Sequence, residues 1–134
     1  MMQNEEPKRE IPAFSQFTGA RYLVIESYTK DGTAVKTPVW FVANNGTLYV
    51  RTDNDTGKVK RIRRDSHIRI APCEPRGTLK GSWVDAKAEV ASEPEAEEAY
   101  SLLKKKYGLQ YRAVRFIGRL QRRKNKAIAL AIKP

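Results

Sequence analysis

The sequence predicts a mainly β fold with accessory helices, in which six antiparallel strands form one curved sheet. Three observations predict this class. Segments of strand-type composition follow one another from residue 21 onward, tight-turn sequences separate the first of them, and the strongest amphipathic helix pattern comes only after residue 91. An antiparallel meander of this length tends to curl and close, because closure removes exposed strand edges. We therefore expect a small barrel with helices packed outside it.

The six predicted strands are rich in β-branched and aromatic residues, which favour extended backbone. They span residues 21–29, 34–43, 47–52, 66–74, 83–91 and 126–134. Asp31-Gly32 and Asn45-Gly46 predict tight hairpin turns between the first three strands. A closed sheet of six strands is too small to enclose a large ligand. Such a ligand must bind outside the barrel or between two copies of the chain.

Four helices are predicted, and the helix after Ser92 has the clearest signals. Ser92-Glu93-Pro94-Glu95 matches a capping box with proline in the first turn, and Gly108 predicts the end of the helix. An apolar stripe predicts the face that packs on the sheet, formed by Ala96, Ala99, Tyr100, Leu103 and Tyr107. The other helices are expected at residues 11–19, 56–64 and 110–122.

Length and composition predict a single domain at residues 11–134, behind a flexible charged segment at residues 1–10. The net charge of +11 favours polyanionic partners, either nucleic acid, acidic lipid or a small anionic molecule. Cys73 is the only cysteine, which excludes an internal disulfide and a zinc site and favours a small buried apolar residue. No signal peptide or membrane-spanning run is present, so a cytoplasmic location is expected and no membrane partner.

The stretch "RTDNDTGKVKRIRRD" at residues 51–65 combines a possible anion site with a run of cations. A P-loop would need glycine where Thr52 stands and serine or threonine after Lys58, so that interpretation fails. Thr56, Gly57 and Lys58 still place a hydroxyl, a close backbone approach and an ammonium group at a predicted helix N-terminus, which suits a phosphate. An exposed basic helix anchored by Val59 and Ile62 is the alternative.

Nucleic-acid binding is another alternative for the cations. A stripe that tracks a phosphate backbone would comprise residues 58–64 together with Arg119, Arg122, Arg123, Lys124 and Lys126. The sequence lacks the regularly interleaved exposed aromatic residues on which single-strand binders stack bases. It also lacks a helix-turn-helix, zinc-finger or RNA-recognition signature, so nucleic acid is the weaker choice of partner.

Side-chain catalysis finds little support in the sequence. The single histidine, His67, falls on the outer face of a predicted strand, and no nucleophile–histidine or metal-ligand group is present. An enzyme built on this chain would therefore rely on a cofactor for its chemistry. Trp40 and Trp83 could line an aromatic pocket, although packing in the core is the more ordinary role for each.

Three stretches together resemble a known family. "DGTAVKTPVWF", "LYVRT" leading to "TGKVKRIRRD", and "IRIAPCEPRG" are similar to the pyridoxamine-phosphate-oxidase-like split β-barrel proteins. Within that family, they resemble the branch that depends on the deazaflavin cofactor F420. "KKYGLQYR" and the closing "AIALAIKP" also resemble that branch, so the resemblance covers about residues 14–134.

The resemblance implies a homodimer of split barrels with one flavin-type cofactor in each of two grooves at the subunit interface. The cofactor phosphate would lie at Thr56, Gly57 and Lys58, with Lys60 or Arg61 nearby. The ring would lie along the strand formed by Lys36, Thr37, Pro38, Val39 and Trp40. Arg51 and Thr52 would face the ribityl or phosphate portion of the cofactor.

The implied activity is an oxidoreductase that transfers a hydride between reduced F420 and a small organic substrate, with no catalytic side chain and no metal. FMN is the alternative cofactor, because the branches share their phosphate-binding elements. A cofactor carrier without turnover is a further alternative. Nothing in the sequence corresponds to a substrate-phosphate site, so oxidation of pyridoxamine phosphate itself is not implied.

Overall fold

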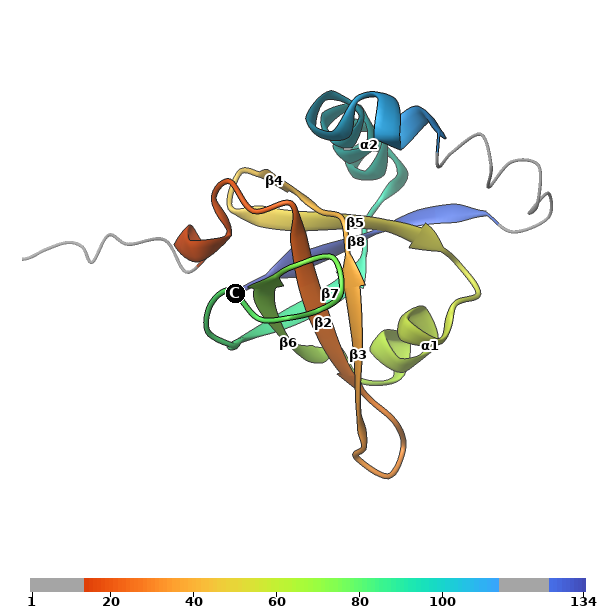
Figure 1. Cartoon of the computed structure of the whole chain (residues 1–134). Helices are drawn as coiled ribbons and strands as arrows, with labels where there is room; N and C mark the ends of the chain where they lie inside the picture. The colour runs from red at the N-terminus through yellow and green to blue at the C-terminus, as the bar shows by residue number, and fades with distance from the viewer. Residues whose placement is uncertain (1–13, 114–125) are drawn as a thin grey trace, which may run out of the picture.

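The structure, a computed structural model, describes residues 14–113 and 126–134. Its centre is one seven-stranded antiparallel sheet in the order β3-β2-β6-β7-β8-β5-β4 (Figure 1). The strands are β2 (Tyr22–Tyr28), β3 (Ala34–Val39), β4 (Val42–Asn44), β5 (Thr47–Asp53), β6 (His67–Cys73), β7 (Val84–Val90) and β8 (Ala127–Lys133). The predicted mainly β class and its antiparallel barrel are confirmed.

The strand order shows that the sheet is rolled. β3 and β4 lie at opposite edges of the sheet, yet only Trp40 and Phe41 separate them along the chain. The two edges must therefore come together at this point, because the three steps from Val39 to Val42 span at most about 11 Å. The prediction of one strand over 34–43 was wrong in this respect, since the chain leaves the sheet at Trp40–Phe41 and re-enters it on the other side. This break accounts for seven strands where six were expected.

The two hairpins predicted from turn sequences are present. Asn45 and Gly46 have φ angles of 53° and 80° and form the two-residue turn between β4 and β5. Positive φ at both central positions is what this turn type requires, which explains the Asn-Gly pair. Gly32, with a φ of 88°, lies in the turn between β2 and β3.

The barrel interior holds the main core. Inward residues alternate along the strands, as with Leu23 and Ile25 on β2 and Ile68 and Ile70 on β6, and all four are fully buried. α1 (Gly57–Arg64) contributes Val59 and Ile62 to the same cluster. Thus α1 packs into the barrel with its apolar face, and its cations lie on the rest of its surface.

α2 (Glu93–Tyr107) lies outside the barrel, over β4, β5 and β8 (Figure 1). Its predicted start is confirmed, because Ser92 caps the helix and its Oγ accepts a hydrogen bond from Glu95 N–H at 3.4 Å. The predicted stripe faces the sheet: Ala96, Ala99, Leu103 and Tyr107 are buried. Gly108 ends the helix, with a φ of 56°.

Two of the four helix predictions differ from the structure or extend beyond it. Within the predicted helix at 11–19, the described part forms only a 3-10 turn, η2 (Ser15–Phe17). Phe14 and Phe17, three residues apart, make an edge-to-face contact at 5.8 Å, and this spacing suits the tighter turn. Of the predicted helix at 110–122, residues 109–113 are helical and the remainder lies outside the described residues. Among the helices that the structure describes, none is long and apolar enough to cross a membrane.

Candidate functional site

The start of α1 is the centre of the candidate site. β5 ends at Asp53, three residues lead into the helix, and Thr56 occupies the N-cap position. The Thr56 hydroxyl donates to the Asp53 carbonyl at 3.2 Å and does not cap the first turn. The N–H groups of the first turn therefore lack the side-chain acceptor that an N-cap residue usually supplies, and such groups suit an anion.

Lys58 points back from this turn toward β5. Its Nζ donates to Thr52 Oγ1 at 2.9 Å, and Thr52 Oγ1 lies 3.4 Å from Thr56 Oγ1. Burial lowers the pKa of Lys58 and the neighbouring Arg61 lowers it further, whereas Asp53 acts in the opposite direction. The ammonium group is thus held in surroundings that disfavour its charge, and an anion placed beside it would relieve this.

Arg61 completes the cationic side of the first turn. Its Nε donates to the Oγ of buried Ser27 at 2.7 Å, so a side chain of β2 fixes the guanidinium. Its Nη1 lies beside Gly57, because a Cβ on Gly57 would meet that atom at 2.9 Å. Glycine at this position lets Arg61 lie across the start of the helix. Lys60, in contrast, is exposed to solvent.

Arg51 lies on β5 next to Thr52 and is oriented by α2. Its guanidinium carbon is 4.4 Å from the centre of the Tyr100 ring, a cation–π contact. The structure therefore brings together five of the predicted site residues at the end of β5 and the start of α1: Thr52, Thr56, Gly57, Lys58 and Arg61. Arg51 faces α2, on the other side of β5 from Thr52.

The predicted ring-binding residues lie on β3, at one edge of the sheet. Lys36 and Pro38 face outward: Lys36 Nζ is 5.7 Å from the centre of the Trp83 ring, and Pro38 lies against Gly77. Val39 packs against the barrel core, and Thr37 is half-buried. These residues are not part of the cluster at α1.

Trp40 packs against α2. Its ring stacks on Tyr107 with centroids 4.4 Å apart and planes 8° from parallel. The Tyr107 hydroxyl donates to the Arg21 carbonyl at 2.6 Å and accepts from Phe41 N–H at 3.2 Å. Of the two roles considered for Trp40, packing is the one observed, and it fixes the point where β3 passes into β4.

The two groups of residues border the opening of the barrel. β3 pairs only with β2 among the described strands, and β4 pairs with β5 only as far as Tyr49. The part of β5 that carries Arg51 and Thr52 pairs with β8 alone among the same strands. Within residues 14–113 and 126–134, no second strand therefore pairs with the edges of β3 and β5 that border the split, and α1 follows directly from β5.

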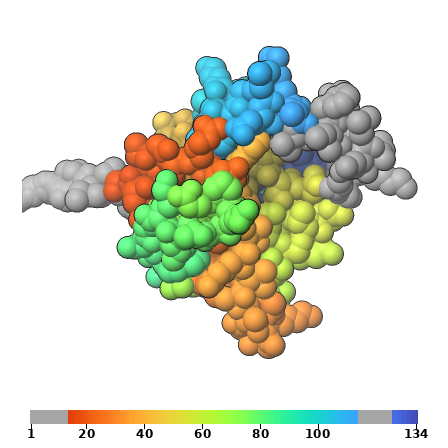
Figure 2. Space-filling model, in the orientation of Figure 1, coloured from red at the N-terminus to blue at the C-terminus, as the bar shows by residue number. Residues whose placement is uncertain are grey.

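A pocket that the sequence did not reveal lies beside this cluster. It has a volume of about 610 Å³ and lies between the β2–β3 hairpin and α1. Its lining residues are Thr29, Lys30, Asp31, Thr33, Arg61 and Arg64. Figure 2 shows the hairpin, in orange, and α1, in yellow-green, side by side on one face of the molecule. Arg61 belongs both to this pocket and to the cluster at the helix start.

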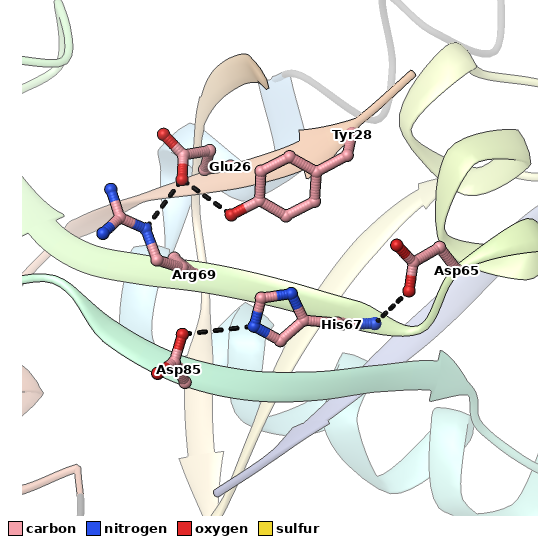
Figure 3. Close-up of polar contacts among 6 residues, drawn as sticks. All are labelled: Glu26, Tyr28, Asp65, His67, Arg69 and Asp85. Carbon is pink, nitrogen blue, oxygen red and sulfur yellow. Dashed lines mark hydrogen bonds and ion pairs between the residues drawn. The ribbon is translucent and has the colours of Figure 1, made fainter. Parts of the chain in front are cut away.

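A separate polar network covers the outer face of β2, β6 and β7 (Figure 3). Glu26 is buried and accepts from Arg69 Nε at 2.7 Å and from the Tyr28 hydroxyl at 2.8 Å. The ring of His67 stacks on Tyr28 at 5.6 Å, and its Nε2 is 3.1 Å from Asp85 Oδ1. His67 is half-exposed on the outer face, as predicted, and pairs with a single carboxylate.

No metal cluster of three or more histidine, cysteine, aspartate or glutamate side chains occurs in the described parts of the chain. The candidate site thus offers cations, hydroxyls, helix N–H groups and free strand edges. Such a set can bind and orient an anionic molecule, and the carboxylate of Asp53 lies near enough to Lys58 to act on its pKa.

Comparison with solved structures shows which proteins share this fold. The haem storage protein HutZ of Vibrio cholerae superposes with a TM-score of 0.64 at 13% identity, covering 87% of this chain and 83% of that one. An FAD-binding protein of Mesorhizobium loti gives 0.59 at 16% identity, covering 88% and 82%. An F420 reductase gives 0.57 at 13% identity, covering 90% of each chain. At these identities the likeness shows the fold alone.

The sequence comparisons decide the family. A search of the curated proteins found no match for this chain. The family profile of pyridoxamine 5'-phosphate oxidase matches residues 10–134, which is nearly the whole chain and includes β3, β5 and α1. The chain therefore belongs to the pyridoxamine 5'-phosphate oxidase family, and its rolled sheet is a split barrel of that family.

Proposed function

We propose that this protein is an oxidoreductase that binds the deazaflavin cofactor F420 and transfers a hydride between the reduced cofactor and a small organic substrate. Family membership supports a flavin-type cofactor in general, since structures of this fold include an FAD-binding protein and an F420 reductase. The observation that carries the proposal is the cluster at the start of α1, where Lys58 is partly buried beside other cations and an uncapped helix turn.

The phosphate of the cofactor would bind at this cluster. Thr56 and Gly57 supply the helix N-terminus, Lys58 supplies an ammonium group, and Arg61 is already fixed beside them by Ser27. A charge-assisted contact to phosphate is about twice as strong as a neutral hydrogen bond. Of the two flanking cations considered, Arg61 is favoured over Lys60, because only Arg61 is held against the first turn.

The ring would lie along β3, whose outer edge has no second strand among those described. Because β3 pairs with β2 on one side, only alternate residues turn their backbone groups to the other side, so either Thr37 and Val39 or Lys36 and Trp40 would pair with the polar edge of a tricyclic ring. Pro38 lacks the N–H. Arg51 and Thr52, on the facing edge of β5, would contact the chain between ring and phosphate. The Trp40–Tyr107 stack holds the end of β3 in place, which fixes where the ring would stop.

We further propose that the protein is a homodimer and that its partner subunit covers the ring. An open split barrel buries too little of a tricyclic ring by itself, and ligands of this size bind mostly enclosed. Bound reduced deazaflavin would supply the hydride. The residues of this chain would contribute binding, orientation and exclusion of water, and these lower the barrier by positioning.

FMN is the second candidate cofactor, because a phosphate at α1 is common to both molecules. Basic nucleic-acid binding is the third, because the net charge of +11 attracts any polyanion. A carrier that binds F420 without turnover would share every contact described above. These candidates differ in affinity, salt dependence and turnover.

One titration separates them. Purified protein would be titrated with F420, FMN and a single-stranded oligonucleotide at 50 and 300 mM salt, with flavin fluorescence and anisotropy as the measured signals. We expect saturable F420 binding, one molecule per chain, that persists at the higher salt. Oligonucleotide affinity that exceeds F420 affinity and falls steeply with salt would contradict the proposal.

Hydride transfer would be followed by the absorbance of oxidised F420 with a panel of unsaturated and oxidised organic acceptors. Oxidation of reduced F420 by an acceptor only in the presence of the protein would support an enzyme over a carrier. Sedimentation of the same samples tests the dimer, and a monomer that binds F420 with full affinity would remove the partner subunit from the proposed site.

A further inference from the structure

The pocket between the β2–β3 hairpin and α1 has the composition of an anion site. It is a broad, open depression of the surface with a volume of about 610 Å³. Three cations line it, Lys30, Arg61 and Arg64, against the single carboxylate of Asp31. Arg61 and Arg64 are one helical turn apart, so they occupy the same face of α1.

Both guanidinium groups are fixed by neutral partners. Arg61 Nε donates to Ser27 Oγ at 2.7 Å, and Arg64 Nη2 donates to the Tyr28 carbonyl at 2.6 Å. Each of these bonds uses one of five N–H donors, so it orients the group and does not exhaust its capacity. A ligand that binds here would meet two guanidinium groups that are already oriented. Binding would therefore cost little side-chain entropy of the two arginines.

The carboxylate of Asp31 is engaged within the hairpin itself. It accepts hydrogen bonds from Thr29 Oγ1, from Thr33 Oγ1 at 2.8 Å and from Thr33 N–H at 3.2 Å. These bonds hold the pKa of Asp31 below its usual value, so the group stays charged and stays in the turn. Asp31 therefore stabilises the hairpin side of the pocket, and within the described residues it forms no ion pair with Arg61 or Arg64 on the α1 side. The pocket keeps a net positive charge.

The orientation of Arg61 and Arg64 beside the pocket is not shared by every cation of α1, as Arg63 shows. It neighbours Arg64 in the same helix, but its Nη2 donates to Asn54 Oδ1 at 2.7 Å and it does not line the pocket. Two adjacent arginines with the same charge thus have different surroundings, one oriented into a pocket and one against a surface amide.

We propose that this pocket binds a small polyanion through its phosphate or carboxylate groups, with Arg61, Arg64 and Lys30 as the cationic contacts. The three cations favour a molecule with two or more negative charges, and the volume admits more than a single phosphate ion. Binding here requires no flavin-type cofactor, although the pocket adjoins the start of α1 and Arg61 belongs to both.

The test uses the full chain with two probes, citrate and inorganic tripolyphosphate, which represent polycarboxylates and polyphosphates. Binding would be followed by calorimetry and by the amide chemical shifts of a 15N-labelled sample. We expect one-to-one binding of at least one probe, with the largest shifts at residues 29–33 and 61–64. The probe that binds more tightly identifies the class of anion.

Arg64→Gln and Arg63→Gln form a matched pair, because they remove the same charge from adjacent positions of one helix. We expect Arg64→Gln to weaken the better probe roughly tenfold or more, the effect of losing a charge-assisted contact, and Arg63→Gln to weaken it less than about threefold. Lys30→Gln gives an independent check, since Lys30 is exposed in the hairpin and its removal leaves the core untouched.

Three results would overturn the proposal. Equal weakening by Arg63→Gln and Arg64→Gln would show that the probes respond only to the net charge of the helix. Shifts spread over other basic surfaces, with none at residues 29–33, would place binding elsewhere. Failure of both probes to bind the folded wild-type protein at millimolar concentration and low salt would show that the pocket is only solvated.

Discussion

Replacing Lys58 with methionine should leave the fold intact and weaken cofactor binding. In the folded chain the Lys58 ammonium is partly buried beside Arg61, and these surroundings lower its pKa, so the fold gains little from its charge. Methionine has a similar length and keeps the apolar stem. The variant loses the charge-assisted hydrogen bond to Thr52, worth about 1.5–3 kcal/mol, and is relieved of the cost of burying a charge, which opposes this loss. We expect the free energy of unfolding to change by less than about 1 kcal/mol.

Cofactor affinity should respond much more strongly. A charge-assisted contact to phosphate contributes about 1.5–3 kcal/mol, which corresponds to roughly 10- to 150-fold in Kd. The measurement pairs urea denaturation with F420 titration on the same preparations. Lys104→Met is the matched control, because Lys104 is exposed on the last turn of α2. A variant that loses more than about 2 kcal/mol of stability but binds F420 normally would refute the reasoning, since Lys58 would then be a structural residue.

Cofactor binding beside Lys58 should also depend on pH. An anion beside Lys58 raises its pKa, so binding takes up a proton when the free protein has lost one. Affinity should therefore fall as the pH rises through the lowered pKa of Lys58, at a pH below the ordinary lysine value of 10.5. Lys58→Arg should abolish this dependence, because arginine stays protonated throughout that range.

Three further predictions concern single residues. Gly57→Ala should weaken F420 binding without unfolding the protein, because the added Cβ would lie 2.9 Å from Arg61 Nη1 and must displace the guanidinium group. An F420 affinity that is unchanged by titration would place Arg61 outside the site. Arg69→Met should lower the melting temperature at pH 7 more than Glu26→Gln does, because it leaves a buried carboxylate without its cation. That difference should shrink in acid as Glu26 becomes protonated, and a difference that persists at pH 3 would show that packing, not charge, is responsible. Burial, and to a smaller extent Arg21, lowers the pKa of Lys106 to about 8, so the folded protein disfavours the charged form of this lysine. The free energy of unfolding should therefore rise between pH 8 and 10.5, relative to that of Lys106→Met. Parallel curves of stability against pH for the two proteins would contradict this.

Most strand and helix positions could be predicted because their signals are local. Alternation, Asn-Gly turns and the capping box at Ser92 each depend on a few neighbouring residues, and β2, β5, β6, β7 and α2 lie within two residues of their expected bounds. The break at Trp40–Phe41 could not be predicted in this way. The sequence "PVWFVA" is continuously apolar, and the interactions that hold the break come from Tyr107, 66 residues away.

The same distinction applies to the site. Thr52, Thr56, Gly57 and Lys58 are close in sequence, so their proximity followed from the expected strand and helix. Tyr100 beneath Arg51 comes from another element, and its role depends on how α2 packs. Ser27 had one usable signal: it follows Leu23 and Ile25 on the inward face of β2, where a hydroxyl needs a partner. Arg61 is that partner.

The packing of α1 connects the core to the site. Val59 and Ile62 are three residues apart and fully enter the barrel core, so the rotation of the helix about its axis is set by apolar packing. That rotation determines where the cations between and beside them point. Lys58 precedes Val59 and turns toward β5, and Arg61 precedes Ile62 and turns toward β2. Each cation thus reaches a strand hydroxyl, Thr52 on β5 for Lys58 and Ser27 on β2 for Arg61. The basic run is therefore not a uniform solvated surface, because burial of two apolar side chains forces two of its cations to the opening of the barrel while Lys60 and Arg63 remain exposed.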